Sequence, residues 1–175
     1  MRRLLLSILV LATVAASPTP GLAASVEDSN QARGPLDLRR LAGSKHDATA
    51  PLHVRLRTYG RWPAKLLDAD GPNRLFLLFQ ANHDGNAEFI GEIRFLNGRL
   101  SMRVTRRSGT FVRRLPVRHP TRDEVRMTLP RGLPNPDGQI KLAATMRYRT
   151  SQGPCSNVCD ERIPNGGWLK VTPGL

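Results

Sequence analysis

The stretch that decides the fold is residues 88–106, which read EFIGEIRFLNGRLSMRVTR. In each half of it apolar residues alternate with polar ones. This is the pattern of a β-strand with one buried face, because successive side chains of a strand point to opposite sides of the sheet. The halves are joined by Asn97-Gly98, a pair that accepts the positive φ angles of a tight hairpin turn. The stretch therefore predicts two antiparallel strands joined by a short turn.

The same alternation recurs on both sides of this hairpin. It is found in residues 52–59, 125–129 and 140–149, and residues 75–79 are apolar on both faces, as in a strand at the centre of a packed sheet. Turn-forming pairs, among them Ser108-Gly109 and Asp137-Gly138, separate the runs. Short strands at this spacing predict an all-β fold, which we expect to be a single antiparallel β-sandwich, jelly-roll-like, of about eight or nine strands.

The first 24 residues have the organisation of a cleavable secretory signal peptide. A cationic start at Arg2 and Arg3 precedes an apolar run over residues 4–16, and Leu22-Ala23-Ala24 offers small residues to a signal peptidase. The run is shorter than the roughly 20 apolar residues that cross a bilayer. We expect cleavage after Ala24, with Ala23 and Ala16 as alternatives, and a secreted product with no membrane span.

The expected domain organisation follows from this interpretation. Residues 1–24 are the signal peptide, residues 25–35 carry few apolar side chains and are expected to form a flexible lead-in, and residues 36–175 form one β-sandwich domain. Cys155 and Cys159 are the only cysteines, so in an exported chain they are predicted to form a disulfide. A zinc site would need four Cys or His ligands, and no His lies near them in the sequence.

The chain is strongly basic, with 27 Lys and Arg against 14 Asp and Glu and a formal net charge of +13. Many of the cations occupy the polar phase of the predicted strands and so point away from the core. They are Arg55, Arg57, Arg94, Arg103, Arg126, Lys141, Arg147 and Arg149. If these strands share one sheet, the cations form a basic plate that binds phosphate or sulfate. The alternative is that they are dispersed over two faces and only solvate the sheets.

Within this set, the pairs Arg55/Arg57 and Arg147/Arg149 are the strongest candidates for ligand binding, because residues two apart on a strand project side by side. Tyr59 and Trp62, at the end of a predicted strand, are candidates for stacking on a sugar ring. The alternative for Trp62 is a plug at the end of the core, the commoner place for a large aromatic side chain.

The sequence gives weaker evidence for a metal site or a catalytic site. Asp84 and Glu88 are weak candidates for calcium ligands, but Asp and Asn are also the residues that hairpin turns select. No other metal or cofactor is expected. The chain has no G-x-S-x-G motif, and no catalytic residue is assigned.

The order of several features resembles a known group. Trp62 is followed by the apolar strand 75–79 and a turn over residues 82–86, and the chain closes on Cys155 and Cys159. This resembles uncharacterised exported β-sandwich proteins of high-GC bacteria, which are similar to carbohydrate-binding-module family nine and DOMON domains. The resemblance covers most of the mature chain and implies a jelly-roll-like sandwich with a ligand-binding role. Such relatives carry an acidic turn where this chain has residues 80–84, a departure that argues against a metal there.

These observations predict a secreted, non-catalytic binding module for an extracellular glycan or anionic polymer. Nucleic acid is expected to bind only as a non-specific polyanion, because the predicted contacts are made by charge. Two alternatives remain open: a secreted hydrolase with an unrecognised site, and a structural or interaction protein.

Overall fold

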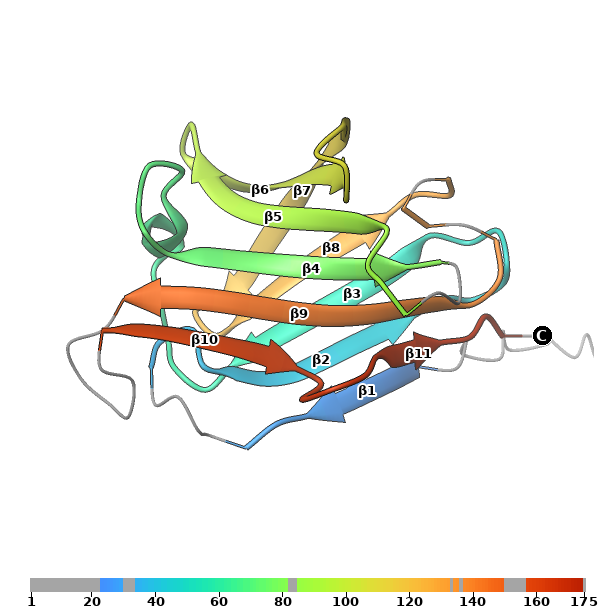
Figure 1. Cartoon of the computed structure of the whole chain (residues 1–175), viewed down its shortest axis with the longest axis horizontal. Helices are drawn as coiled ribbons and strands as arrows, with labels where there is room; N and C mark the ends of the chain where they lie inside the picture. Colours follow the sequence, from blue (N-terminus) through green and yellow to red (C-terminus); the bar gives the residue numbers. More distant parts are fainter. Residues whose placement is uncertain are drawn as a thin grey trace, which may run out of the picture.

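A computed structural model describes residues 23–29, 34–81, 85–132, 134–135, 137–149 and 157–174, and the structural statements below concern these residues. They form an antiparallel all-β fold with one short 3-10 helix, η1 (Ala64–Leu67). Figure 1 shows the arrangement. The strands are β1 (Ala23–Glu27), β2 (Leu38–Ser44), β3 (Leu52–Thr58), β4 (Arg74–Gln80), β5 (Phe89–Leu96), β6 (Arg99–Arg106), β7 (Phe111–Thr121), β8 (Glu124–Leu129), β9 (Ile140–Arg149), β10 (Val158–Ile163) and β11 (Leu169–Val171).

The predicted all-β antiparallel class is confirmed, and the number of strands is higher than the eight or nine expected. All pairings are antiparallel in the order β1-β2-β3-β8-β7-β6-β5-β4-β9-β10, and β11 also pairs with β9. The hairpin predicted from Asn97-Gly98 joins β5 to β6, and both turn residues have positive φ, 52° and 78°. The additional strands include β1, β7 and β10, where apolar and polar residues do not alternate cleanly.

One continuous sheet is folded over on itself into two layers. Layer A consists of β1, β2, β3 and β8, and layer B of β6, β5, β4, β9, β10 and β11; in Figure 1 β4 and β9 lie in front of β2 and β3. Strand β7 belongs to both layers, because its first half pairs with β6 and its second half with β8. At the opposite side, β10 and β11 lie beside β2 and β1, so the sheet is nearly barrel-shaped.

The core lies between the inner faces of the two layers. Each strand contributes its apolar phase, such as Leu52, Val54 and Leu56 of β3, all of which are buried. Where β2 passes close to layer B it carries Gly43, at which a Cβ atom would lie 2.6 Å from a methyl carbon of Val171. The close approach of the layers therefore requires a residue without a side chain at this point.

Part of the segment expected as a lead-in belongs to the sheet. Ser25, Val26 and Glu27 pair with β2 as part of β1, and the backbone N–H of Asp28 donates to the carbonyl of Arg39 over 2.9 Å. The physical reason is local: Val26 is partly buried against the core, and the backbone groups of β2 would otherwise lack partners on this side. Residues 1–22 of the predicted signal peptide lie outside the described residues, and its last two, Ala23 and Ala24, belong to β1.

Buried acidic groups lie where β10 meets β2. Glu161 Oε2 accepts the backbone N–H of Leu38 over 2.8 Å, and its side chain also bonds to the fully buried Asp37. Burial, together with the negative charges of Asp37 and Asp28, raises the pKa of Glu161 to about 8. The raised pKa keeps Glu161 protonated at neutral pH, so that its carboxyl O–H donates a hydrogen bond to Asp37 instead of repelling it as a second negative charge.

This contact makes stability depend on pH. The pKa of Glu161 is above its ordinary value of 4.5, so the contact contributes fully below about pH 4.5 and its contribution is lost as pH rises to about 8. In Glu161→Gln an amide keeps the donor without ionising, and we expect this loss of stability to disappear. Urea unfolding across this pH window measures it, with Glu27→Gln at an exposed strand end as control. An unchanged pH dependence in Glu161→Gln would contradict the assignment.

Candidate anion-binding groove

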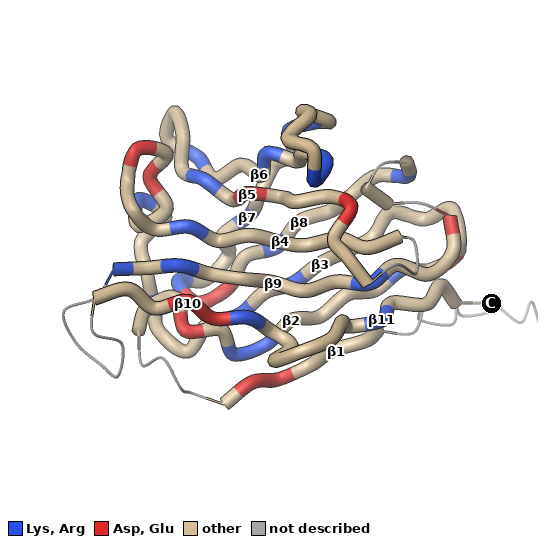
Figure 2. The backbone as a smooth tube through the Cα atoms, viewed as in Figure 1, with Lys and Arg blue, Asp and Glu red and all other residues tan. Residues whose placement is uncertain are grey.

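The fold places the predicted cations on two opposite outer faces. Five arginines lie on the outer face of layer A and its continuation into β7: Arg40, Arg55, Arg57, Arg118 and Arg126. Lys141, Arg94, Arg103, Arg147 and Arg149 lie on the outer face of layer B. Figure 2 shows Lys and Arg on strands of both layers. The predicted pairs Arg55/Arg57 and Arg147/Arg149 are therefore not brought together, and the alternative of two separate faces describes this structure.

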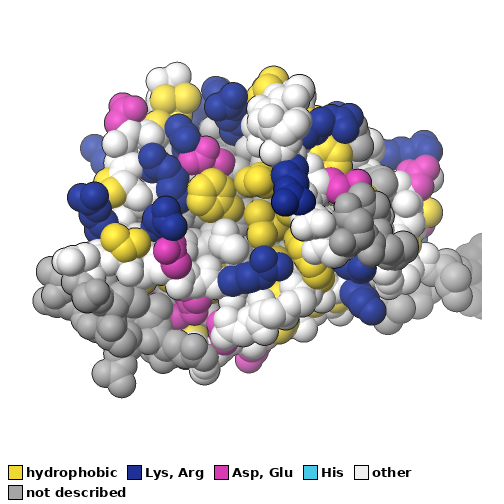
Figure 3. Space-filling view, in the orientation of Figure 1, with side chains coloured by type: hydrophobic (Ala, Val, Ile, Leu, Met, Phe, Trp, Pro, Cys, Tyr) yellow, Lys and Arg dark blue, Asp and Glu magenta, His cyan; other side chains and the backbone are white. Residues whose placement is uncertain are grey.

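The cations of layer B are interrupted by other side chains. Glu92 contacts both Arg74 and Arg94, at 3.2 Å and 2.7 Å, and Arg147 makes two hydrogen bonds to Asp160, at 2.6 Å and 3.1 Å. Figure 3, which views this face, shows hydrophobic and acidic side chains between the basic ones. Layer B thus has a mixed surface in which several cations are already neutralised.

The outer face of layer A is hollowed into a groove of about 710 Å³. Across the sheet, the register places Ser25, Ala42, Arg55, Arg126 and Arg118 side by side on five neighbouring strands. Ser25 and Ala42 have short side chains, so the surface is hollow at their side of the row. The three arginines border the hollow at the other side. Neighbouring strands are about 4.8 Å apart, so the three arginines start within about 10 Å of one another.

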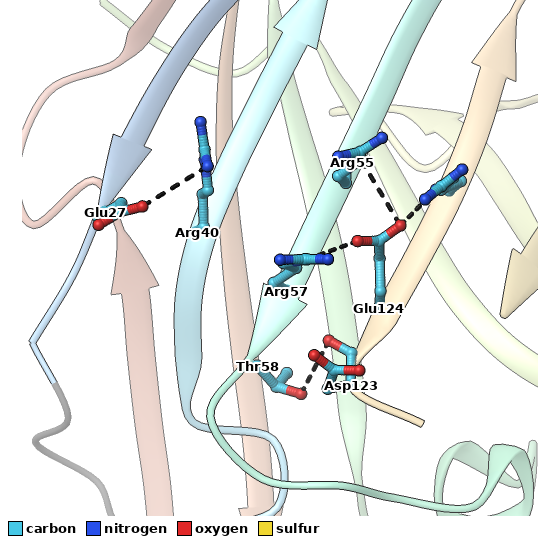
Figure 4. Close-up of polar contacts among 8 residues, drawn as sticks. Glu27, Arg40, Arg55, Arg57, Thr58, Asp123 and Glu124 are labelled. Atoms are coloured by element: carbon cyan, nitrogen blue, oxygen red, sulfur yellow. Dashed lines mark hydrogen bonds and ion pairs between the residues drawn. The ribbon is translucent and has the colours of Figure 1, made fainter. Parts of the chain in front are cut away.

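A buried glutamate lies beneath these arginines. Glu124 is 1% exposed, and its carboxylate contacts three guanidinium groups. Arg57 Nε donates to Oε2 over 2.5 Å, Arg126 Nε donates to Oε1, and Arg55 Nε lies 3.5 Å from Oε1. Figure 4 shows Arg55 and Arg57 converging on Glu124. The carboxylate is thus the centre of a cationic cluster.

The electrostatics of Glu124 follow from this geometry. Burial opposes its ionisation, but the hydrogen bonds from Arg57 and Arg126 and the charge of Arg55 outweigh burial, and the pKa of Glu124 is lowered from its ordinary value. In turn, the hydrogen bond to Glu124 raises the pKa of Arg57. The carboxylate is therefore ionised at neutral pH, and it offsets the repulsion between Arg55 and Arg126, which face each other directly across β3 and β8.

The sequence carries a signal for Glu124 that our sequence interpretation missed. Glu124 lies two residues before Arg126 on β8, so both side chains project from the same face. It follows the turn between β7 and β8, and the register places it opposite Arg57. A single acidic residue in the polar phase of a basic strand is the pattern that indicates such a cluster.

The aromatic candidates have other roles. Trp62 is 1% exposed, stacks on His119 with ring centres 4.2 Å apart, and donates from Nε1 to Thr58 Oγ1 over 3.1 Å. A ring buried in this way favours the alternative, a plug at the end of the core, and nothing in the described residues supports a ligand-binding role for Trp62. Tyr59 is 38% exposed, but its hydroxyl donates to the carbonyl of Asp28 over 2.5 Å, away from the residues that line the groove.

The weak calcium candidates are not assembled into a site by the described residues. Asp84 lies outside them, and Glu88 Oε2 accepts the backbone N–H of Ala81 over 2.7 Å. Within the described ranges, no group of three or more His, Cys, Asp or Glu side chains is placed to hold a metal ion. Cys159 is buried in β10, whereas Cys155 is outside the described residues, and the disulfide between them stays a prediction.

Comparisons with known proteins add no family. No protein-family model, no curated protein and no solved structure matches this chain. The resemblance to exported β-sandwich proteins stays a hypothesis. In the part of the chain that the structure describes, no helix has the length and apolar character of a membrane span.

The ion pairs around Glu124 predict that removal of two of its arginines lowers the stability of the protein. In Arg55→Ser/Arg126→Ser the buried carboxylate keeps only Arg57. We expect the free energy of unfolding to fall by roughly 2 kcal/mol, less than the cost of a fully unpaired buried charge because one partner remains. Urea denaturation of the variant and the wild type measures the difference.

The matched control is Arg103→Ser/Arg114→Ser, a second pair of arginines that face each other across neighbouring strands. Glu92 lies opposite Arg103, but its ion pairs within the described residues are to Arg74 and Arg94. Removal of the two arginines therefore relieves their repulsion at the cost of the contact between Arg103 and the Phe111 ring, and should change stability little. Equal losses in the two double variants would show that the cluster around Glu124 has no special role in stability.

Proposed function

We propose that this protein is a secreted binding module that holds an anionic extracellular polymer in the groove of layer A. The observation that carries the proposal is the row of Arg55, Arg126 and Arg118 on neighbouring strands beside the groove. A guanidinium keeps its charge at physiological pH and donates two parallel hydrogen bonds to an oxyanion. Three such groups within about 10 Å favour a ligand with several closely spaced negative charges.

The shape of the groove supports a polymer over a single small ion. The groove is lined from five strands, β1, β2, β3, β7 and β8, and in a chain cleaved after Ala24 it extends from Ser25 at one side to Arg118 at the other. Hydroxyl groups of Ser25, Ser44 and Thr128 line it together with the arginines and are suited to the neutral hydroxyls of a glycan. We therefore favour an anionic glycan as the ligand, with nucleic acid as a non-specific polyanion.

Binding is also favoured over the alternative of hydrolysis. Hydrolysis of a glycosidic bond commonly uses two carboxyl groups that flank the bond. Among the described residues that line the groove there is no Asp or Glu, and the carboxylate of Glu124 lies buried beneath the arginines. The geometry supports retention of a polymer, and we assign no catalytic step.

The proposal is tested by binding to heparin over a salt series. Arg118 borders the groove, and no ion pair joins it to an acidic side chain within the described ranges. Arg118→Ser should weaken binding without disturbing Glu124. The control Arg114→Ser removes the same charge from the same strand, outside the groove lining, and should change binding less.

Affinity in the wild type should fall steeply between about 0.1 M and about 1 M salt, because the screening length shortens from about 10 Å to about 3 Å. Retention that is independent of salt, or equal losses in Arg118→Ser and Arg114→Ser, would count against the groove as the binding site.

Export is the second part of the proposal and has its own test. Cleavage after Ala24 leaves Ser25, Val26 and Glu27 paired with β2, and Arg40 Nη2 donates to Ser25 Oγ over 3.0 Å. We expect mass spectrometry of the culture supernatant to find a mature chain that begins at Ser25. An exported form that still carries Met1, or a protein found only inside the cell, would refute this part of the proposal.

A further inference from the structure

We infer that Glu124 is a positioning residue that, with Arg57 as a further partner, turns the outer edges of the groove arginines Arg55 and Arg126 toward a ligand, and that the groove thereby selects polymers bearing tetrahedral oxyanions, phosphate or sulfate. This inference rests on the proposed function and names the ligand class for the same groove. Glu124 thus assists the binding of anions by orienting the arginines, although its own negative charge repels anions.

Each arginine has more hydrogen-bond donors than Glu124 uses. A guanidinium carries five N–H donors, one on Nε and four on the two terminal nitrogens. In all three arginines the atom nearest Glu124 is Nε. Arg57 and Arg126 donate from Nε to Glu124, and Arg55 Nε lies in ion-pair contact with it, so the edge formed by the two terminal nitrogens is available and presents two parallel donors to an oxyanion.

Exposure agrees with this division of donors. The side chains of Arg55, Arg57 and Arg126 are 48%, 36% and 49% exposed, whereas that of Glu124 is 0% exposed. Each arginine is therefore held at its inner side and open to solvent at its outer side. Holding long side chains in place before binding lowers the entropy that the ligand must otherwise remove.

Charge points to the ligand class. Three guanidinium groups and one carboxylate have a net charge of +2, and Arg118 stands next to Arg126 in the register. A ligand that neutralises this cluster needs more than one negative charge within a few ångströms. A sulfate ester presents three outer oxygens and adjacent groups of a polyphosphate present two each, so such ligands can accept from the outer edges of two neighbouring arginines at once, whereas a single ligand carboxylate has two coplanar oxygens, which one two-donor edge already satisfies.

The decisive experiment uses Glu124→Gln, for which two explanations predict opposite signs. If the groove attracts polyanions by charge alone, removal of a negative charge should tighten binding. If Glu124 positions the arginines, binding should weaken by about tenfold, the loss of one charge-assisted hydrogen bond. The amide has a single acceptor oxygen, and its NH₂ group faces donors, so it cannot accept from both Arg57 Nε and Arg126 Nε as the two carboxylate oxygens do.

The matched control is Glu27→Gln at the edge of the same layer. Glu27 lies 3.7 Å from Arg40 and is 64% exposed, so this exchange makes the same change in net charge without releasing the arginines that the buried carboxylate holds. We expect Glu27→Gln to bind heparin as tightly as the wild type or more tightly. Affinity is measured by titration at one fixed ionic strength, after thermal denaturation has established that each variant is folded.

A second pair of variants tests positioning should Glu124→Gln fail to fold. Arg126→Lys keeps the charge, but a lysine ammonium cannot bond to Glu124 through one edge and present a planar two-donor edge through another. We expect a loss of about tenfold. Arg103→Lys, on the outer face of layer B, should leave binding unchanged.

Four probes separate the outcomes: heparin carries sulfate, polyphosphate carries phosphate, polygalacturonate carries carboxylate, and single-stranded DNA is a non-specific polyanion. We expect heparin and polyphosphate to bind at least about tenfold more tightly than polygalacturonate, and Glu124→Gln to erase this difference. Equal affinity for polygalacturonate would overturn the ligand class.

Tighter binding by Glu124→Gln, or unchanged binding by Arg126→Lys, would overturn the positioning role while the proposed function stands. If polygalacturonate and DNA both bind as tightly as heparin, the groove is a general polyanion site and the selection is refuted. If the wild type binds none of the four probes, the proposed function itself fails and this inference fails with it.

Discussion

The buried carboxylate of Glu124 is the interaction on which the outer face of layer A depends. Arg55 and Arg126 face each other across two strands, and like charges in that position destabilise a sheet. Glu124 lies between them with Arg57 at its other oxygen, so one negative charge offsets the repulsion among three positive ones. Removal of the carboxylate would leave a basic row that opposes the pairing of β3 with β8, and the apolar faces of both strands contribute to the core.

The core in turn determines which residues can be near Glu124. Because each strand must bury its apolar phase, its polar phase is forced onto one outer face, and a shift of register by one residue would reverse this arrangement. The folding of a single sheet through β7 then decides which strands share an outer face. Strands β3, β8 and the second half of β7 face one way, and β4, β5 and β9 face the other. The groove therefore follows from hydrophobic burial combined with strand order.

Structural features that depend on residues close together in the chain were predicted correctly from the sequence. Alternation around Asn97-Gly98 is local, and it led to the correct hairpin and fold class. Strand β7 was missed because it contains Pro116 and Pro120, and proline is disfavoured in central strands. The contact between Arg57 and Glu124 joins residues 67 positions apart, and no local pattern shows that β3 pairs with β8. The outward direction of each arginine was predictable, but its neighbours were not.

The two outer faces show why the placement of acidic groups matters more than the number of cations. On layer B, acidic groups lie level with the arginines: the side chain of Asp160 is 59% exposed and accepts from both Nε and Nη2 of Arg147, so one two-donor edge of that guanidinium is already used. On layer A, Glu124 is buried and accepts only from Nε of Arg57 and of Arg126, with Arg55 Nε nearby. An acid beside a cation competes with an anionic ligand for the same donors, whereas an acid beneath it leaves those donors available and restricts how the side chain moves. The depth of the carboxylate thus distinguishes a solvated basic surface from one suited to holding an anion.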